Sequence, residues 1–284
     1  MRQLLKLCGE TPLVKITDRI YGKLETFNPS GSVKDRMVSY VVDRALSRGD
    51  IKEDTVLCDA TSGNTGIALS MIAASLGLKC IIFMPANMSE ERKQMMKVYG
   101  SLIINAPDDD FERAIEMRDE YLSGNPNSWS PMQFSNPDNV ECHKNITGPE
   151  ILRDVCAIDK KWGAFIHGSG TGGTIEGVRQ FLSVGDIDTK IVMVQPAESP
   201  HGIQGIADGK EFLAKDADMD EIITIPTQVA IERARSFAKE TGLLVGISAG
   251  ANIAASEIWE SKNPGSSCIV TMLCDRGERY MSIY

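Results

Sequence analysis

One lysine lies where its amine could take part in covalent chemistry. Residues 28–31 (Asn-Pro-Ser-Gly) form a turn cluster, because Pro fixes φ and Gly permits a positive φ. Ser32 then predicts the N-cap of a helix, which puts Lys34 in the first helical turn. The partial positive charge of a helix N-terminus disfavours an ammonium, so this lysine should lose its proton readily and suits a Schiff-base amine. A solvated lysine near a helix start is the alternative interpretation.

Two glycine-containing loops each follow a short apolar strand and precede a helix. Residues 61–66 (Thr-Ser-Gly-Asn-Thr-Gly) offer hydroxyl, amide and backbone donors suited to a carboxylate, with helix capping alone as the alternative. Residues 168–174 (Gly-Ser-Gly-Thr-Gly-Gly-Thr) predict backbone N–H groups that cradle a phosphate at a helix N-terminus. A dinucleotide site and a tight turn without a ligand stay open for this second loop. A dinucleotide fold prefers an acidic residue about 20 positions on, and here Glu198 comes slightly late.

The elements that must position these residues alternate between strand and helix. Apolar runs predict strands at 11–16, 20–24, 56–58, 80–84, 102–104, 164–166, 190–194, 243–245 and 268–273. Amphipathic or capped segments predict helices at 32–47, 67–76, 89–98, 108–122, 147–155, 174–182, 228–239 and 248–259. Residues 200–227 indicate mostly turn and loop. The alternation from about residue 37 to 130 predicts a parallel α/β unit.

Composition excludes several classes of protein. With 42% hydrophobic and 24% charged residues, the 284-residue chain is typical of a globular protein with one large or two modest domains. A net charge of −9 disfavours nucleic acid or an anionic membrane as the main partner. No apolar run is long enough for a membrane helix, and the N-terminus does not indicate a signal peptide. Seven scattered cysteines favour a reducing cytoplasm, and the three histidines lack metal-ligand spacing, so no metal is expected.

Taken together and in this order, the stretches 23–36, 59–66 and 168–174 resemble the β-family (fold type II) of pyridoxal-phosphate enzymes, and more narrowly cysteine synthase, O-acetylserine sulfhydrylase. The resemblance runs from Gly9 to Tyr280. It implies an α/β fold of two parallel-sheet domains with the cofactor in the cleft between them. The implied smaller domain, residues 37–133, is mobile, grips the substrate and closes over the cleft. Residues 1–36 and 134–284 then form the larger domain, which binds pyridoxal 5′-phosphate.

The resemblance also implies roles for individual residues. Lys34 holds pyridoxal phosphate covalently and removes the substrate α-proton. The remaining cofactor-binding residues implied are Asn64, Gly170, Thr171, Gly172, Gly173, Thr174 and Ser248. Within this set, Asn64 bonds the ring hydroxyl, the glycine loop holds the 5′-phosphate, and Ser248 meets the pyridine nitrogen. The substrate-binding residues implied are Thr61, Ser62, Gly63, Thr65, Gln133 and Gly205.

One departure from the family pattern bears on the reaction. The segment Gly205-Ile206-Ala207-Asp208-Gly209 places a carboxylate where typical cysteine synthases are apolar. If Asp208 faces the substrate it could activate a water, and a solvated turn aspartate is the alternative. The expected reaction is β-replacement, which makes L-cysteine from O-acetyl-L-serine and sulfide through an α-aminoacrylate intermediate. Sulfide release from cysteine, aided by Asp208, and cystathionine synthesis stay open, as does a non-catalytic binding protein. A homodimer is expected from the family, and a serine acetyltransferase is a candidate partner.

Overall fold

The computed structural model describes all residues except 1–2, 208–210 and 266, and the chain divides into two compact units. Unit 1 contains residues 3–8 and Asn28–Asn136, and unit 2 contains Gly9–Phe27 and Pro137–Tyr284. These contact-based units differ from the predicted domains in residues 3–8, 28–36 and 134–136, which the prediction assigns to the larger domain. Residues 28–36 lead directly into a helix whose apolar face belongs to the unit 1 core. The mobility and the substrate-gripping role of the smaller domain stay predictions.

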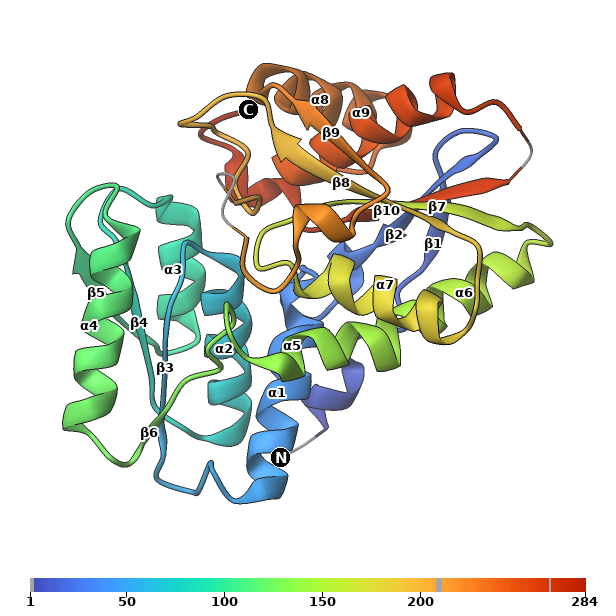
Figure 1. Ribbon diagram of the computed structural model, residues 1–284. Coiled ribbons are helices and arrows are strands. Elements are labelled where there is room, and N and C mark those ends of the chain that lie inside the picture. Colours follow the sequence, from blue (N-terminus) through green and yellow to red (C-terminus); the bar gives the residue numbers. More distant parts are fainter. Residues whose placement is uncertain (1–2, 208–210, 266) are drawn as a thin grey trace. The chain divides into compact units, whose positions relative to one another are not determined.

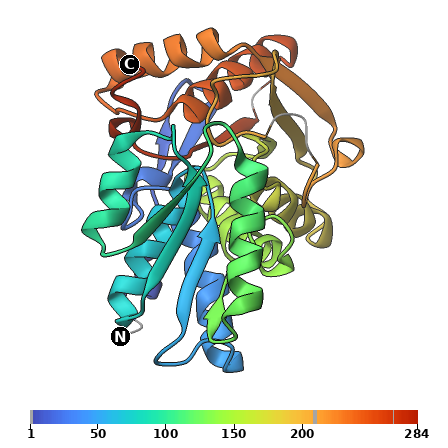
Figure 2. The same ribbon diagram turned by 90° about the vertical axis from the view of Figure 1, so that its left-hand side faces the viewer.

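Unit 1 is built on a four-stranded parallel sheet in the order β5-β4-β3-β6. Its strands are β3 (Val56–Ala60), β4 (Cys80–Pro85), β5 (Leu102–Ala106) and β6 (Ser128–Trp129). Its helices are α1 (Lys34–Arg48), α2 (Asn64–Leu76), α3 (Glu90–Val98) and α4 (Phe111–Gly124). Figure 2 shows the strands of this sheet, blue to green, between the cyan helices and green α4.

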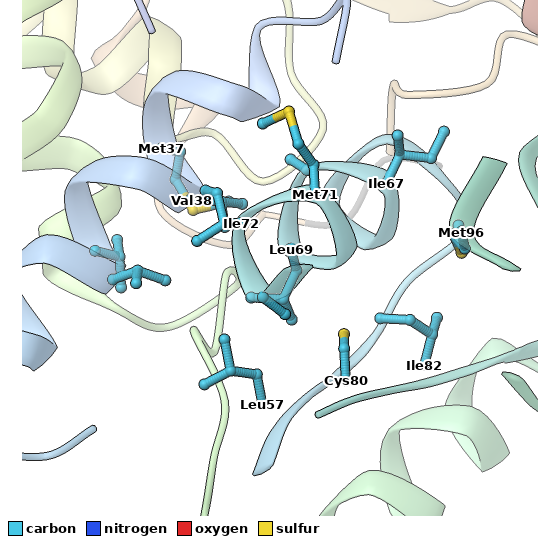
Figure 3. Close-up of a cluster of buried hydrophobic side chains, with 14 of the residues drawn as sticks. Met37, Val38, Leu57, Ile67, Leu69, Met71, Ile72, Cys80, Ile82 and Met96 are labelled. Atoms are coloured by element: carbon cyan, nitrogen blue, oxygen red, sulfur yellow. The ribbon is translucent and has the colours of Figure 1, made fainter. Parts of the chain in front are cut away.

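The central strands β3 and β4 of the unit 1 sheet are buried on both faces. Leu57 and Ile82 join Met37 and Val38 of α1 and Ile67 of α2 in one apolar cluster (Figure 3). Cys58, Ala60 and Phe83 face α4 on the other side. Burial on both faces explains why β4 is a continuous apolar run and why β3 is apolar apart from Asp59.

Unit 2 is built on a six-stranded sheet in the order β1-β2-β10-β7-β8-β9, in which β1 is antiparallel to β2 and the other pairs are parallel. Its strands are β1 (Leu13–Lys15), β2 (Ile20–Leu24), β7 (Trp162–Gly168), β8 (Lys190–Pro196), β9 (Glu221–Ile225) and β10 (Cys268–Leu273). Its helices are α5 (Pro137–Cys142), α6 (Gly148–Ala157), α7 (Gly173–Val184), α8 (Thr227–Thr241) and α9 (Ile247–Lys262). One face of the sheet packs on α8 and α9, and α6 and α7 lie on the other (Figure 1).

Four sequence predictions are corrected by the structure. Ser32 is not a capping residue, because α1 begins at Lys34 after Val33 and makes no side-chain cap. Ser248 lies inside α9, which begins at Ile247 after Gly246. The predicted strand 243–245 is reduced to one isolated bridge between Val245 and Arg276. The predicted loop 200–227 contains β9, an edge strand whose charged and exposed residues conceal its periodicity.

Candidate functional site

Lys34 opens α1, and a buried carboxylate fixes the turn before it. Asp35 accepts a hydrogen bond from the Ser30 backbone N–H at 2.6 Å and a second from the Ser30 hydroxyl. Gly31 has a φ of +89°, and its N–H donates to the Asn28 carbonyl at 2.8 Å. These hydrogen bonds fix the conformation of the turn 28–31, and with it the direction in which α1 and Lys34 begin.

Ser32 places a buried hydroxyl two residues before Lys34. Its Oγ has no hydrogen-bond partner among the residues that the structure describes. A buried polar atom without a partner normally costs free energy, so it is a candidate ligand contact. This is one observation of the structure that fits a polar group bound near the start of α1.

The loop 61–66 joins β3 to α2 and presents its polar groups at the start of that helix. The Gly63 N–H donates to Thr61 Oγ1 at 3.1 Å, and Ser62 is exposed. The Thr65 hydroxyl donates to Gln133 Oε1 at 2.7 Å, so the structure brings these two predicted residues together within unit 1. The N-terminus of α2 carries backbone donors and a partial positive charge, which suits an anion.

A buried arginine that the sequence analysis missed supports this loop. Arg92 of α3 donates from Nη1 to the Ser62 carbonyl at 3.1 Å and is only 2% exposed. A Cβ on Gly63 would lie 2.6 Å from Arg92 Cδ, so glycine is needed for this close approach. Arg92 could have been suspected only from its position in α3 after the next strand, which is a weak signal.

In unit 2 the loop 168–174 joins β7 to α7, and its glycines leave no room for a side chain. A Cβ would lie 2.4 Å from the Gly205 carbonyl oxygen at Gly170 and 2.1 Å from Asn139 Oδ1 at Gly173. Gly172 has a φ of +83°, and a Cβ there would lie 2.4 Å from the Ala214 backbone nitrogen. Close packing against residues 139, 205 and 214 therefore explains the three glycines, and a loop of this composition at a helix start is typical of anion sites.

The hydroxyl groups of this phosphate-loop candidate are oriented by buried side chains of α5 and of the π-helix that follows it, His143–Thr147. Asn139 Nδ2 donates to Thr171 Oγ1 at 3.1 Å, and Thr174 Oγ1 lies 3.2 Å from His143 Nε2. Asn139 and His143 were not predicted, because nothing in their spacing links them to residues about 30 positions later. A cradle of glycine backbone and threonine hydroxyls fits a phosphate well.

Gly205 and Ser248 lie beside the phosphate-loop candidate in unit 2. A Cβ on Gly205 would be 3.8 Å from Ser248 Oγ, and Gly205 has a φ of +97°. The Ala207 N–H donates to the Ser169 carbonyl at 2.8 Å, which holds the segment 203–207 against the loop. The structure therefore brings Gly170, Gly205 and Ser248 together. Asp208 lies outside the described residues, so its role stays a prediction.

The predicted residues thus form two groups. Lys34, the loop 61–66 and Gln133 belong to unit 1, and the loop 168–174, Gly205 and Ser248 belong to unit 2. The described residues contain no group of three or more His, Cys, Asp or Glu side chains that could hold a metal ion. None of the helices that the structure describes is long and apolar enough to cross a membrane.

Comparison with known proteins gives a consistent picture. The family model described as "Pyridoxal-phosphate dependent enzyme" matches residues 4–275. The chain is 40% identical to cysteine synthase B of Campylobacter jejuni, over 98% of this chain and 96% of the relative.

Two solved structures are also similar over the whole length. A cysteine synthase of Entamoeba histolytica has a TM-score of 0.91 and 36% identity, covering 100% of this chain and 90% of the other. A hydrogen sulfide-producing enzyme of Fusobacterium nucleatum has a TM-score of 0.91 and 35% identity, covering 99% and 90%.

Proposed function

Because this chain belongs to the family of pyridoxal-phosphate dependent enzymes, we propose that it makes L-cysteine from O-acetyl-L-serine and sulfide. The cofactor is pyridoxal 5′-phosphate. The observation that carries the proposal is the 40% identity to a cysteine synthase over 98% of the chain. The glycine cradle of unit 2 supports the cofactor, because its donors and its lack of side chains suit a phosphate.

Unit 2 is proposed to be the larger, cofactor-binding part. The backbone N–H groups of residues 170–174 and the hydroxyls of Thr171 and Thr174 would bind the 5′-phosphate. Ser248 would meet the pyridine nitrogen with a hydroxyl, which leaves that nitrogen largely unprotonated. When bound, the cofactor supplies an electron-withdrawing ring that stabilises negative charge on the substrate α-carbon. A ring without the extra proton withdraws electrons less strongly, which favours β-elimination and replacement over transamination.

Unit 1 is proposed to grip the substrate. Thr61, Ser62, Gly63 and Thr65, together with Gln133, would bind the carboxylate of the amino acid, and Asn64 would bond the ring hydroxyl of the cofactor. The partial charge at the start of α2 favours an anion at this position. Gly205 of unit 2 would leave space for the substrate amine.

Lys34 is proposed to move the proton. Its Nζ would hold the cofactor covalently in the resting enzyme and, as a free amine, would accept the α-proton of the substrate. Acetate leaves from the β-carbon with its bonding electrons, and hydrosulfide adds to the same carbon. Lys34 returns the proton to the α-carbon, so that atoms and charges balance.

A product assay with a lysine pair tests the proposal. Purified protein loaded with pyridoxal phosphate receives O-acetylserine and sulfide, and cysteine is measured for wild type, Lys34→Ala and Lys190→Ala. Lys190 is an exposed lysine paired with Asp220 and serves as the matched control. We expect Lys34→Ala to lose the visible absorbance of the bound cofactor and at least about 10³-fold in turnover, while Lys190→Ala matches wild type. Cysteine formation by Lys34→Ala at the wild-type rate would refute the assignment.

Sulfide release from cysteine is the second candidate function. It is favoured by the similarity to the hydrogen sulfide-producing enzyme, at 35% identity and a TM-score of 0.91. The same holoprotein is given cysteine alone, and wild type is compared with Asp208→Ala. Fast sulfide release that depends on Asp208 would make degradation the main reaction. A separate assay, in which the same holoprotein receives homocysteine and serine, tests cystathionine synthesis.

The sequence also leads us to propose a homodimer, docking of a serine acetyltransferase and a cytoplasmic location. Analytical ultracentrifugation of the protein, alone and mixed with an acetyltransferase, tests the first two. Fractionation of cells that express the chain tests the third.

A further inference from the structure

Asp59 is a buried carboxylate two residues before the loop 61–66. It lies in β3, whose other residues are uncharged, and is 0% exposed. Arg118 of α4 places Nη1 3.6 Å from Asp59 Oδ1, and the Ser130 hydroxyl donates to the same oxygen at 3.2 Å. A carboxylate buried in an interior strand of a sheet needs such partners, because burying an isolated charge costs free energy.

The second oxygen of Asp59 faces the glutamine that the proposed function assigns to the substrate carboxylate. Gln133 Nε2 donates to Asp59 Oδ2 and to the Ala60 carbonyl, both at 3.4 Å. Gln133 Oε1 accepts the Thr65 hydroxyl at 2.7 Å. A continuous chain of contacts therefore runs from Arg118 through Asp59 and Gln133 to Thr65, entirely within unit 1.

The charged and titratable groups around Asp59 come from several elements. Arg118 also pairs with Asp119 at 2.8 Å, so its positive charge is shared between two carboxylates. The thiols of Cys58 and Cys80 are neutral neighbours, because burial raises the pKa of Cys58 to about 12 and that of Cys80 to about 11. Burial raises the pKa of Asp59 to about 6, against the opposing effect of Arg118 and of the bonds from Ala60 and Ser130.

We propose that Asp59 is a positioning residue of the substrate loop, and that a carboxylate bound by residues 61–66 and a proton bound by Asp59 stabilise each other. The inference rests on the proposed function, because it takes that loop to be the carboxylate site. A carboxylate on the loop and an ionised Asp59 would be two negative charges that share Gln133, and burial of Asp59 weakens the screening between them. Protonation of Asp59 removes one of the two charges. A neutral carboxyl also holds Gln133 Nε2 less firmly than a carboxylate does, which frees that donor for the ligand.

The proton affinity of Asp59 and the carboxylate affinity of the loop must change by the same factor. Whatever factor a bound carboxylate adds to the proton affinity of Asp59, a proton on Asp59 adds to the carboxylate affinity. A rise of one pKa unit on binding corresponds to a tenfold tighter complex at low pH than at high pH. Near neutral pH, where Asp59 of the free protein is mostly ionised, binding should take up a fraction of a proton.

Formate and isothermal titration calorimetry test this linkage without turnover. Formate carries a carboxylate and no amine, so it probes the loop alone, and the protein is used as the holoenzyme. Titrations in two buffers with different heats of protonation give the number of protons taken up, and titrations from about pH 7.5 to about pH 5.5 give the affinity profile. We expect uptake between zero and one proton per formate at about pH 7 and several-fold tighter binding at about pH 5.5.

Three variants assign the proton. Asp59→Asn should abolish both the uptake and the pH dependence. Asp119→Asn is the matched control, because it removes a carboxylate from the same Arg118 and keeps the bond between Asp59 and Gln133. It should keep the uptake and the pH dependence, with the pH midpoint moved downward because Arg118 is then no longer shared with the carboxylate of Asp119. Ser130→Ala keeps the Asp59 carboxyl and removes one bond to its ionised form, so the pH midpoint should move upward. This last variant tests the inference even if Asp59→Asn does not fold.

The outcomes separate the inference from the proposed function. Formate binding that weakens in Ser62→Ala but takes up no proton, or takes up the same proton in Asp59→Asn, overturns the role of Asp59 and leaves the proposed function intact. Formate binding that Ser62→Ala does not change overturns the carboxylate role of the loop, and the inference fails with it. Proton uptake that is lost in Asp59→Asn and kept in Asp119→Asn and Ser130→Ala supports both the inference and the proposed function.

Discussion

The side-chain oxygen of Asn252 accepts a hydrogen bond from the backbone N–H of Gly168 at 2.9 Å, although 84 residues separate the two. Asn252 lies one helical turn after Ser248 in α9, and Gly168 is the last residue of β7 before the phosphate-loop candidate. The other end of the Asn252 amide donates to the Met272 carbonyl of β10 at 2.9 Å. One buried amide thus ties a helix to the ends of two neighbouring strands.

Asn252→Ala is expected to lower both stability and cofactor affinity. The change leaves two buried backbone groups without partners, at about 1–3 kcal/mol each, and releases the start of the loop. Urea unfolding and titration of the apoprotein with pyridoxal phosphate measure the two effects. Asn145→Ala, at an exposed asparagine bonded to Glu141, is the control and should change neither. Equal cofactor affinity in Asn252→Ala and wild type would contradict the expected role.

Gly172→Ala is expected to abolish or greatly weaken cofactor binding. Alanine is strained at the φ of +83°, and its Cβ would lie 2.4 Å from the backbone nitrogen of Ala214, which cannot move alone. Absorbance of the bound cofactor after dialysis measures the loss. Gly124→Ala is the control, because a Cβ there meets nothing within 4 Å, and it should bind the cofactor as wild type does.

Lys23→Met is expected to destabilise the protein by about 3–5 kcal/mol, because it removes the positive partner of a buried ion pair. Lys23 is 0% exposed, and its Nζ lies 2.7 Å from Glu150 Oε1. Glu150 also accepts the backbone N–H groups of Glu10 and Thr11. Urea unfolding gives the free energy difference. Adding Glu150→Gln should recover part of it, because an amide oxygen still accepts a bond without carrying charge; no recovery would argue against the electrostatic cause.

The difference in unfolding free energy between wild type and Asp59→Asn is expected to fall as pH rises. The pKa of Asp59 is about 6 in the folded protein against 3.8 as the ordinary value, so the folded state binds the extra proton between these limits. Its stabilising contribution is complete below about pH 3.8 and is lost as pH rises through about 6. The full span is about 3 kcal/mol. Urea unfolding at about pH 4, 5.5 and 7.5 measures it, and a difference that does not change with pH would contradict the burial of this carboxyl.

The sequence predicts the buried part of the fold better than its edges. The strands β3, β4, β7, β8 and β10 are each built around a mostly apolar, buried run, and their type follows from that pattern. The edge strand β9 buries only Ile223 and Ile225 and follows a segment rich in Asp, so turn composition conceals it. Helix starts at Lys34 and Ile247 differ from the predicted capping serines because no side-chain cap forms at either place.

The residues of the candidate site are predictable where they share a motif and hidden where they meet only in space. In the loops 61–66 and 168–174, the polar and glycine residues of the candidate site are consecutive in the sequence. Arg92, Asn139 and Asn252 contact these loops from other elements, and no local spacing connects them. Asp59 had one available signal, since it is the single charge in a buried strand.

The strand order of unit 2 has a consequence for how the chain is made. β2 pairs with β10, so a strand formed from residues 20–24 must wait for residues 268–273 before it has its parallel neighbour. A nascent chain emerging from the ribosome can complete unit 1 at Asn136, while the first hairpin stays without its sheet until β10 has been synthesised. β10 is third in the order of the sheet but the last strand to be synthesised, so it joins the hairpin β1–β2 to the strands β7, β8 and β9 only at the end of synthesis. The hairpin β1–β2 is therefore the segment that a chaperone would find exposed the longest.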